Sequence, residues 1–191
     1  MSQYHRCLYS AGILPYQVME NNKIYFLIGK GMDGTWSDFG GKCDPSDKNN
    51  IKETAAREFY EESMGSVLSL GAIRNALKNP SNFTLINSSS LSGSRYYMFM
   101  LRVPIIPDVC IDRFNKTHEF ISYMTSRQGK SSPYPYEYLE KTDIALISLD
   151  TLFSLLTQEK MEQELGWPLR KVFRKTLLNC RDKLHLLRSG I

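Results

Sequence analysis

Three glutamates, Glu58, Glu61 and Glu62, are spaced so that one helix would carry them on one side. The surrounding segment is rich in alanine, and its apolar residues recur every four positions from Ile51 to Phe59, a pattern typical of a helix. At about 100° per residue, the three glutamates fall within an arc of roughly 100°. Their carboxylates repel one another, at a few tenths of a kcal/mol for each close pair. Because Mg²⁺ binds to a few carboxylates together with substrate phosphates, the pattern indicates a magnesium site for phosphate chemistry.

A longer motif surrounds these glutamates. Gly41 is the second residue of a Gly-Gly-Lys turn. A polar loop follows, and Arg57 precedes Glu58-Phe59-Tyr60-Glu61-Glu62. Arg-Glu-Phe-x-Glu-Glu downstream of Gly-Gly-Lys resembles the signature of the Nudix hydrolases. An acidic helix face taken alone is more often a solvated surface, so the longer motif is what favours the metal site. The resemblance covers roughly residues 9–157.

The motif differs from the Nudix pattern in its spacing. The segment between Gly41 and Arg57 is two residues longer than the family pattern. The first glutamate of the family falls on Asp47 when counted forward and on Asn49 when counted back. A supporting acidic role for Asp47 is one interpretation. Met64 stands where the family usually has glycine, and a glycine follows one position later.

The resemblance implies a role for each residue of the motif. Glu58 and Glu62 would bind Mg²⁺, or Mn²⁺ in its place, and the carbonyl oxygen of Gly41 is a further ligand. Glu61 would bind a second ion or hold a metal-bound water. Arg57 would orient a glutamate. The reaction implied is hydrolysis of the pyrophosphate linkage of a nucleoside diphosphate joined to another group.

Residues outside the motif are candidates to complete the site. Family members often recruit another carboxylate from a later loop. Glu140 is preferred here over Glu137 because its distance from the following strand resembles the arrangement in small family members, and an exposed surface glutamate is the alternative for each. Lys42 could meet a phosphate, and Trp36 or Phe39 could stack on a base. Solvent exposure of the lysine and core packing of the rings are the alternatives.

The resemblance implies an α/β fold, a Nudix-type α/β/α sandwich with a mixed β-sheet and a C-terminal helical extension. Residues 1–157 would form the hydrolase domain, with an insertion at about 108–140. Residues 158–191 would be a basic helical extension of the same domain, with one long helix from Trp167 onward. Residues 67–73 are expected to form a strand.

Length, charge and cysteine spacing indicate which partners and which cellular location to expect. The chain has 191 residues and a net charge of +4, which mildly favours an anionic partner. No apolar run is long enough to span a bilayer, and the N-terminal segment lacks the apolar core of a signal peptide. The four cysteines show no metal-type spacing, so free thiols are expected. We therefore expect no membrane partner and a cytoplasmic location, in the host cytoplasm if the protein is viral.

The motif leaves three functions open. One is a pyrophosphatase acting on small nucleotides, and another is an mRNA-decapping enzyme that releases m7GDP from capped RNA. The motif also looks like that of decapping Nudix proteins of large DNA viruses, which carry extra helices. The basic C-terminal helix, the insertion and the positive charge favour RNA contact, and a packing helix whose polar face is basic is the alternative interpretation of that helix. The third function is a non-catalytic Nudix-fold module that binds a nucleotide or a partner protein.

Overall fold

A seven-stranded mixed sheet forms the centre of the computed structural model, which describes residues 8–19, 22–89, 93–105, 107–128, 132–158, 162 and 164–188. The strands are β1 (Tyr9–Val18), β2 (Ile24–Gly31), β3 (Trp36–Ser37), β4 (Phe39–Lys42), β5 (Phe83–Ser89), β6 (Arg95–Arg102) and β7 (Lys141–Ser148). The helices are α1 (Ile51–Glu62), α2 (Leu70–Lys78), α3 (Pro107–Gln128), α4 (Leu149–Thr157), α6 (Lys171–Asn179) and α7 (Arg181–Arg188). Single 3-10 turns are η1 (Pro45–Asp47), η2 (Pro80–Asn82) and η4 (Tyr136–Leu139).

Strand β1 organises the sheet. It pairs with β6 in parallel over its length, while its first half pairs antiparallel with β4 and its end pairs antiparallel with β2. The order is β3-β2-β1-β6-β5, with β7 on β2. Residues 11–17 of β1 are all buried, as expected for a strand covered on both faces. This double pairing brings the Gly-Gly turn in β4 to the middle of the sheet.

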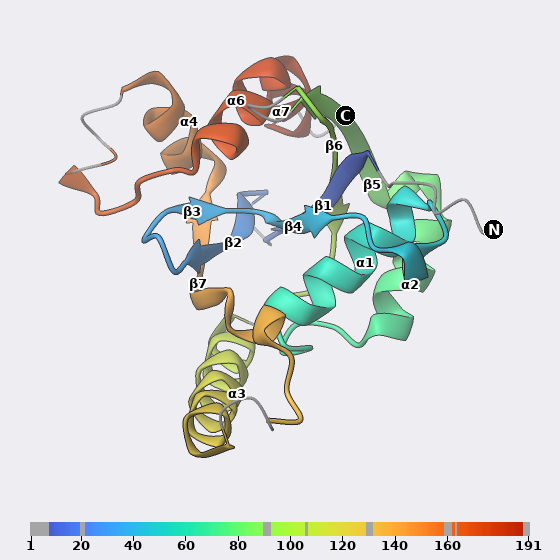
Figure 1. Ribbon diagram of the computed structural model, residues 1–191. Coiled ribbons are helices and arrows are strands. Elements are labelled where there is room, and N and C mark those ends of the chain that lie inside the picture. Colours follow the sequence, from blue (N-terminus) through green and yellow to red (C-terminus); the bar gives the residue numbers. More distant parts are fainter. Residues whose placement is uncertain are drawn as a thin grey trace.

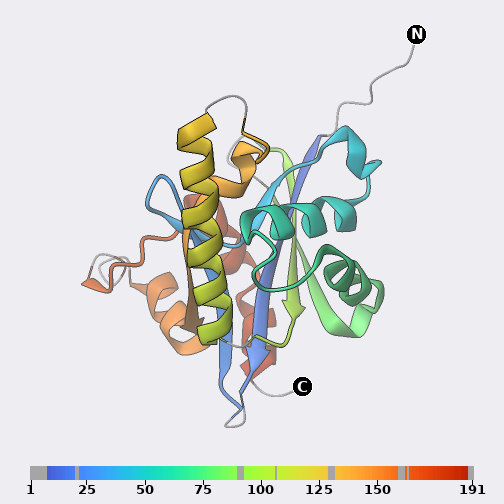
Figure 2. The same cartoon turned by 90° about the horizontal axis from the view of Figure 1, so that it is seen from below.

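Helices cover both faces of the sheet (Figures 1 and 2). Helices α1, α2 and α3 share one buried core with Phe39 and Phe99, and helices α4, α6 and α7 share another with Phe26 and Met98. Successive residues of a strand point to opposite faces, so Met98 and Phe99 supply the two cores in turn. The α/β fold with helices on both sides of a mixed sheet is confirmed.

Two expectations about local structure are wrong. The predicted strand at 67–73 is largely replaced by α2, because Ser69 caps a helix by accepting from the N–H of Ala72, and Ile73 and Leu77 bury one face. The single long helix predicted from Trp167 is divided. Residues 167–170 are not helical, α6 follows, and its C-cap Cys180 (φ −115°) separates it from α7.

The C-terminal extension belongs to the core of the protein. Phe173, Leu177 and Leu184 are at most 1% exposed and pack in the same cluster as strands β1, β2 and β6. Leu169 joins them from the segment before α6. The apolar side fixes α6 and α7 to the sheet, and the basic residues Lys171, Lys175, Arg181 and Lys183 are exposed.

The structure also bears on the expectations about membrane-spanning segments and free thiols. None of the described helices combines the length and apolar character needed to cross a membrane. Cys110 and Cys180 are free and buried, whereas Cys43 is disulfide-bonded, so the expectation of free thiols is wrong at Cys43. Cys43 directly follows β4 at the edge beside Tyr9, whose carbonyl accepts from the Cys43 N–H at 3.1 Å.

Candidate active site

Helix α1 places the three glutamates beside the Gly-Gly turn. Asn50 caps the helix by accepting from the N–H of Lys52 at 3.0 Å. Phe59 anchors the buried side, with its ring centroid 5.2 Å from that of Phe39 on β4. The approach is so close that a Cβ on Gly41 would lie 2.5 Å from Glu58 Oε2. Glycine at this position therefore lets the carboxylate lie against the turn.

Arg57 holds the acidic residues in place. Its guanidinium donates two hydrogen bonds of 3.0 Å to the Asp47 carboxylate. It also lies 2.9 Å from Glu58 Oε1 and from Glu61 Oε2, and donates to the Lys42 carbonyl at 2.9 Å. Burial would lower the pKa of Arg57, but these anionic partners outweigh it and raise the pKa. Arg57 is thus an orienting residue whose donors are directed at neighbouring protein groups.

Asp47, and not Asn49, supplies the acidic partner of Arg57. Its carboxylate is 4% exposed and also accepts from the Thr54 hydroxyl at 2.8 Å. Burial would raise the pKa of Asp47, but the Arg57 hydrogen bonds and their neighbours lower it on balance. Lys48 (φ 53°) and Asn49 (φ 57°) follow in the left-handed region. These two residues accommodate the two extra positions in the motif without displacing Asp47.

Glu62 is buried at the end of α1. It is 2% exposed, and its Oε2 accepts from the N–H of Gly40 at 2.7 Å. Its Oε1 lies 3.5 Å from the ammonium of Lys141. Burial raises the pKa of Glu62 to about 8, which the Lys141 charge opposes only in part.

Lys141 is a component of the site that the motif does not contain. It is 2% exposed, and its ammonium donates to Ser37 Oγ at 2.8 Å and to the Asp38 carbonyl at 3.0 Å. Its methylene groups fill the space above Gly29 on the neighbouring strand. The sequence signal was a lysine at the start of a strand directly after Glu140, but lysine is usually exposed there.

A buried pair lies next to Glu62. The Tyr96 hydroxyl donates to the Asp38 carboxylate, and both side chains are buried. Cβ atoms on Gly12 and Gly40 would lie 2.5 and 2.7 Å from that hydroxyl, so the paired glycines provide its space. Burial raises the pKa of Asp38 and that of Tyr96. This pair could not be predicted from the sequence, because Asp38 lies between β3 and β4 while Tyr96 lies on the distant strand β6.

A pocket of about 260 Å³ opens beside these residues. Its lining comes from the end of β2 and the turn after it, the end of α1, the start of β7 and the loop before it, and the segment before α6: Gly31, Met32, Asp33, Glu62, Tyr136, Glu140, Lys141 and Arg170. The structure thus brings Glu140 together with Glu62. Glu137 does not line the pocket, although its charge contributes to the raised pKa of Glu61, whose first cause is burial.

The residues expected to bind substrate lie in different settings. Lys42 is exposed, and its carbonyl is bound by Arg57. Phe39 is fully buried between Phe59 and the Lys141 ammonium. Trp36 is 5% exposed. Neither aromatic ring lines the pocket in this conformation.

The oxygen atoms beside the Gly40–Gly41 turn are of the chemical type that binds a hard divalent cation. Glu58, Glu61, Glu62 and the Gly41 carbonyl present the oxygen ligands that Mg²⁺ and Mn²⁺ take. Burial raises the pKa of Glu58 to about 7, although the neighbouring Arg57 charge acts to lower it. Within the described residues, the side chains are not gathered into a ready metal cluster. Instead, Arg57 forms ion pairs with Glu58 and Glu61, and the Gly40 N–H donates to Glu62.

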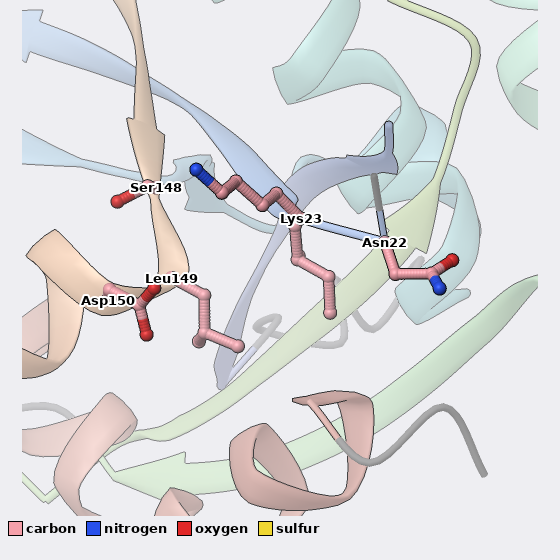
Figure 3. A pocket seen from close by; sticks show the side chains of 6 residues that line it. Asn22, Lys23, Ser148, Leu149 and Asp150 are labelled. Carbon is pink, nitrogen blue, oxygen red and sulfur yellow. The ribbon is translucent and has the colours of Figure 1, made fainter. Parts of the chain in front are cut away.

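A smaller pocket of about 170 Å³ lies elsewhere, at the far ends of β2 and β7 (Figure 3). It is lined by Asn22, Lys23, Ile24, Ser148, Leu149 and Asp150. The strand register pairs Tyr25 with Ser148 at this end and Gly31 with Lys141 at the other. At about 3.3 Å per residue the two ends are roughly 20 Å apart. This pocket is therefore remote from the glutamates of α1.

Comparison with known proteins bears on the fold. No protein-family model matches the sequence, and no curated protein matches it. A Nudix hydrolase from Alicyclobacillus acidocaldarius is 12% identical and similar in structure over 95% of this chain and 90% of the other, with a TM-score of 0.50.

Two further solved structures are similar at low identity. A Nudix hydrolase from M. smegmatis, RenU, is 12% identical with a TM-score of 0.46, covering 93% of this chain and 86% of the other. The MutT protein from Methanosarcina mazei Go1 is 15% identical with a TM-score of 0.46, covering 92% and 94%. Identities of this size bear on the fold alone, and the chain has the fold of the Nudix hydrolases.

Proposed function

We propose that the protein is a divalent-metal-dependent Nudix hydrolase that cleaves the pyrophosphate linkage of a nucleoside diphosphate joined to another group. The observation that carries this proposal is the placement of Glu58, Glu61 and Glu62 against the Gly40–Gly41 turn, with Arg57 fixing two of them. A surface acidic face would not bury Glu62 to 2% exposure or require glycine beside Glu58.

Each residue of the site has a task in this reaction. Glu58 and Glu62, with the Gly41 carbonyl, would hold Mg²⁺ or Mn²⁺, and Glu61 would hold a second ion or an ordered water. When bound, the metal supplies neutralisation of the phosphate oxygens and a lowered pKa of water. Glu140 lines the pocket and is suited to accept a proton from the attacking water.

The first test is an assay with Mg²⁺ and with Mn²⁺ on a panel of nucleotides and capped RNA. Glu61→Gln and Glu62→Gln should each lower turnover by about a hundredfold or more, because each removes a charge from the metal site. Glu53→Gln is the matched control, since Glu53 lies on the same helix but pairs with Arg74 at the surface. Absence of hydrolysis in the wild-type protein with either metal would support a non-catalytic binding module instead.

Capped RNA is the second candidate substrate, and the position of α6 and α7 favours it. Helix α6 starts at the rim of the pocket, and exposed Lys175, Arg181 and Lys183 extend along α6 and α7. An RNA chain leaving the pocket could follow this basic surface.

The variant Lys175→Gln/Arg181→Gln tests this candidate. It should weaken hydrolysis of capped RNA and reduce its salt dependence, while leaving a capped dinucleotide unaffected. Equal salt dependence in the variant and the wild type would exclude this surface from RNA binding.

A further inference from the structure

Lys141 is a buried lysine that connects the start of β7 to the end of α1 and to the β3–β4 junction. Its ammonium donates to Ser37 Oγ at 2.8 Å and to the Asp38 carbonyl at 3.0 Å, and it lies 3.5 Å from Glu62 Oε1. Within the described residues, Glu62 is the one carboxylate that lies within 4 Å of this ammonium. Since a lysine is almost never fully buried unless it is paired, these contacts account for its burial.

The ammonium of Lys141 has no donor left for a substrate. An ammonium carries three hydrogens. Two of them go to the neutral acceptors Ser37 and Asp38, which leaves one for Glu62. Lys141 therefore lines the pocket without a free hydrogen for a phosphate, and its role is directed at the protein.

The strand that accepts from Lys141 is itself held in place. Ser37 lies on β3, which pairs with β2 and also with the segment before α6. In that segment the Pro168 carbonyl accepts from the Trp36 N–H at 2.7 Å, the Arg170 N–H donates to the Trp36 carbonyl at 2.9 Å, and Leu169 forms a parallel bridge with Trp36. The acceptors of Lys141 thus belong to a part of the sheet with partners on several strands.

The methylene stem of Lys141 is confined as well. A Cβ on Gly29 would lie 2.9 Å from Lys141 Cδ and 3.1 Å from Cγ and Cε. The stem fills the space that glycine leaves on the neighbouring strand, so the charge is kept at one position relative to Glu62.

Glu62 is consequently restrained at both carboxylate oxygens. The Gly40 N–H on β4 donates to Oε2 at 2.7 Å, and Lys141 on β7 lies beside Oε1. A carboxylate has about four lone-pair positions, so these contacts leave room for a metal ion. Residues that orient a metal ligand affect metal affinity without contacting the ion.

We infer that Lys141 is a positioning residue for the metal site, which holds the Glu62 carboxylate in the orientation that binds Mg²⁺ or Mn²⁺. The inference rests on the proposed function, because it takes Glu62 as a metal ligand. It assigns to β7 a part in metal binding that the motif on α1 does not contain.

The test is calorimetric titration of the metal-free protein with Mn²⁺ alone. Lys141→Met keeps the apolar stem but removes the charge, and it should weaken Mn²⁺ binding about tenfold or more. Lys52→Met is the matched control. Lys52 donates to the Leu77 carbonyl at 2.8 Å and lies ten positions before Glu62 on α1, about 15 Å along the helix. Its substitution should change the affinity less than about threefold.

A double variant distinguishes positioning from a general structural effect. In a Glu62→Gln background, adding Lys141→Met should change the affinity for Mn²⁺ less than about threefold, because the ligand through which Lys141 acts is already altered. In activity assays, Lys141→Met should need about tenfold more Mn²⁺ for half-maximal rate, while KM for the nucleotide at saturating Mn²⁺ stays within about threefold. Wild-type or tighter Mn²⁺ binding by Lys141→Met, or an equal loss in the Glu62→Gln background, would overturn the inference.

Gly29→Ala provides a second test that retains every charge, should Lys141→Met not fold. The new Cβ must displace the Lys141 stem, so Mn²⁺ binding should weaken about three- to tenfold, whereas Gly71→Ala should bind as the wild type does. An unchanged affinity in Gly29→Ala, or a wild-type protein that binds no Mn²⁺, would contradict the inference. If the wild type hydrolyses nothing but the affinities follow this pattern, the hydrolase proposal fails and the role of Lys141 stands.

Discussion

At the scale of single residues, the close approach of Gly41 to Glu58 makes a specific prediction. In Gly41→Ala the new Cβ would lie 2.5 Å from Glu58 Oε2 and must displace that carboxylate. We expect kcat/KM to fall about ten- to a hundredfold, because catalytic groups tolerate little misplacement. The thermal midpoint should change little, since Gly41 has no left-handed backbone conformation to lose.

Gly71→Ala is the matched control for that substitution. Gly71 lies in α2 with nothing within 4 Å of its added Cβ. Alanine there should raise the free energy of unfolding by about 0.5–1 kcal/mol and leave activity unchanged. Equal loss of activity in both variants would contradict the role given to the Gly41–Glu58 contact.

The buried Glu62 predicts a pH dependence of stability in the metal-free protein. Its pKa of about 8 lies above the ordinary glutamate value, so the folded state keeps a proton that the unfolded state releases between about pH 4.5 and 8. The free energy of unfolding should therefore fall as pH rises through this window, by up to about 1.4 kcal/mol per pH unit.

Urea unfolding at pH 5 and pH 8.5 with a chelator checks this dependence. Glu62→Gln should show a flatter dependence and greater stability than the wild type at pH 8.5, because its amide can still accept from Gly40 without carrying charge. Some dependence should remain, since burial also raises the pKa of Glu58. If the free energy of unfolding depends on pH equally in the two proteins, the raised pKa of Glu62 is contradicted.

Among residues, the sequence predicted those that belong to one local segment. The periodicity of α1 placed its three glutamates on one side, and the structure adds their contacts with Arg57. Lys141 and Asp38 could not be predicted, because their burial depends on strand pairing between distant segments. Arg170 carried only a general basic signal, since its position depends on how its segment docks on β3.

At the scale of elements, the loop before α1 predicts an effect on stability. Lys48 is the C-cap of η1 and has φ 53° and ψ 36°, a conformation that costs a residue with a side chain about 1–2 kcal/mol. We expect Lys48→Gly to raise the free energy of unfolding by up to about 1 kcal/mol and Lys48→Val to lower it, as measured by urea titration. A more stable valine variant would contradict the left-handed turn.

Local sequence patterns predicted two elements wrongly, the strand at 67–73 and the single helix at the C-terminal end. Residues 67–73 contain β-formers, but Ser69 offers a cap and Leu70 to Lys78 has a helical apolar face, so the helix forms. At the C-terminal end the apolar periodicity continues past Cys180, although the backbone turns there. Periodicity predicted which side is buried better than it predicted where a helix ends.

At the scale of the whole molecule, the C-terminal helices are part of the hydrophobic core. Leu177 is fully buried between α6 and the sheet. We expect Leu177→Ala to lower the free energy of unfolding by about 2–5 kcal/mol, as measured by denaturant titration. Leu178→Ala is the control, since Leu178 is 43% exposed and should cost less than about 1 kcal/mol.

Because α6 and α7 are packed in the core, truncating the chain is not a suitable test of RNA binding by these helices. Removing the chain after residue 157 would uncover the side chains that α6 and α7 bury. Loss of activity would then report unfolding as readily as loss of an RNA contact. Substitutions of exposed charges, which leave the buried side of α6 intact, are the appropriate variants.

The junction between the C-terminal segment and β3 has a spectroscopic consequence. The chain contains two tryptophans, Trp36 and Trp167, and their ring centroids lie 4.6 Å apart across this junction. Two indoles at this separation couple electronically, so the tryptophan emission and the tryptophan bands of the near-ultraviolet circular dichroism arise at one place in the folded protein. These signals report directly whether the segment from Trp167 to Arg170 is docked on β3, and they do so without any added label.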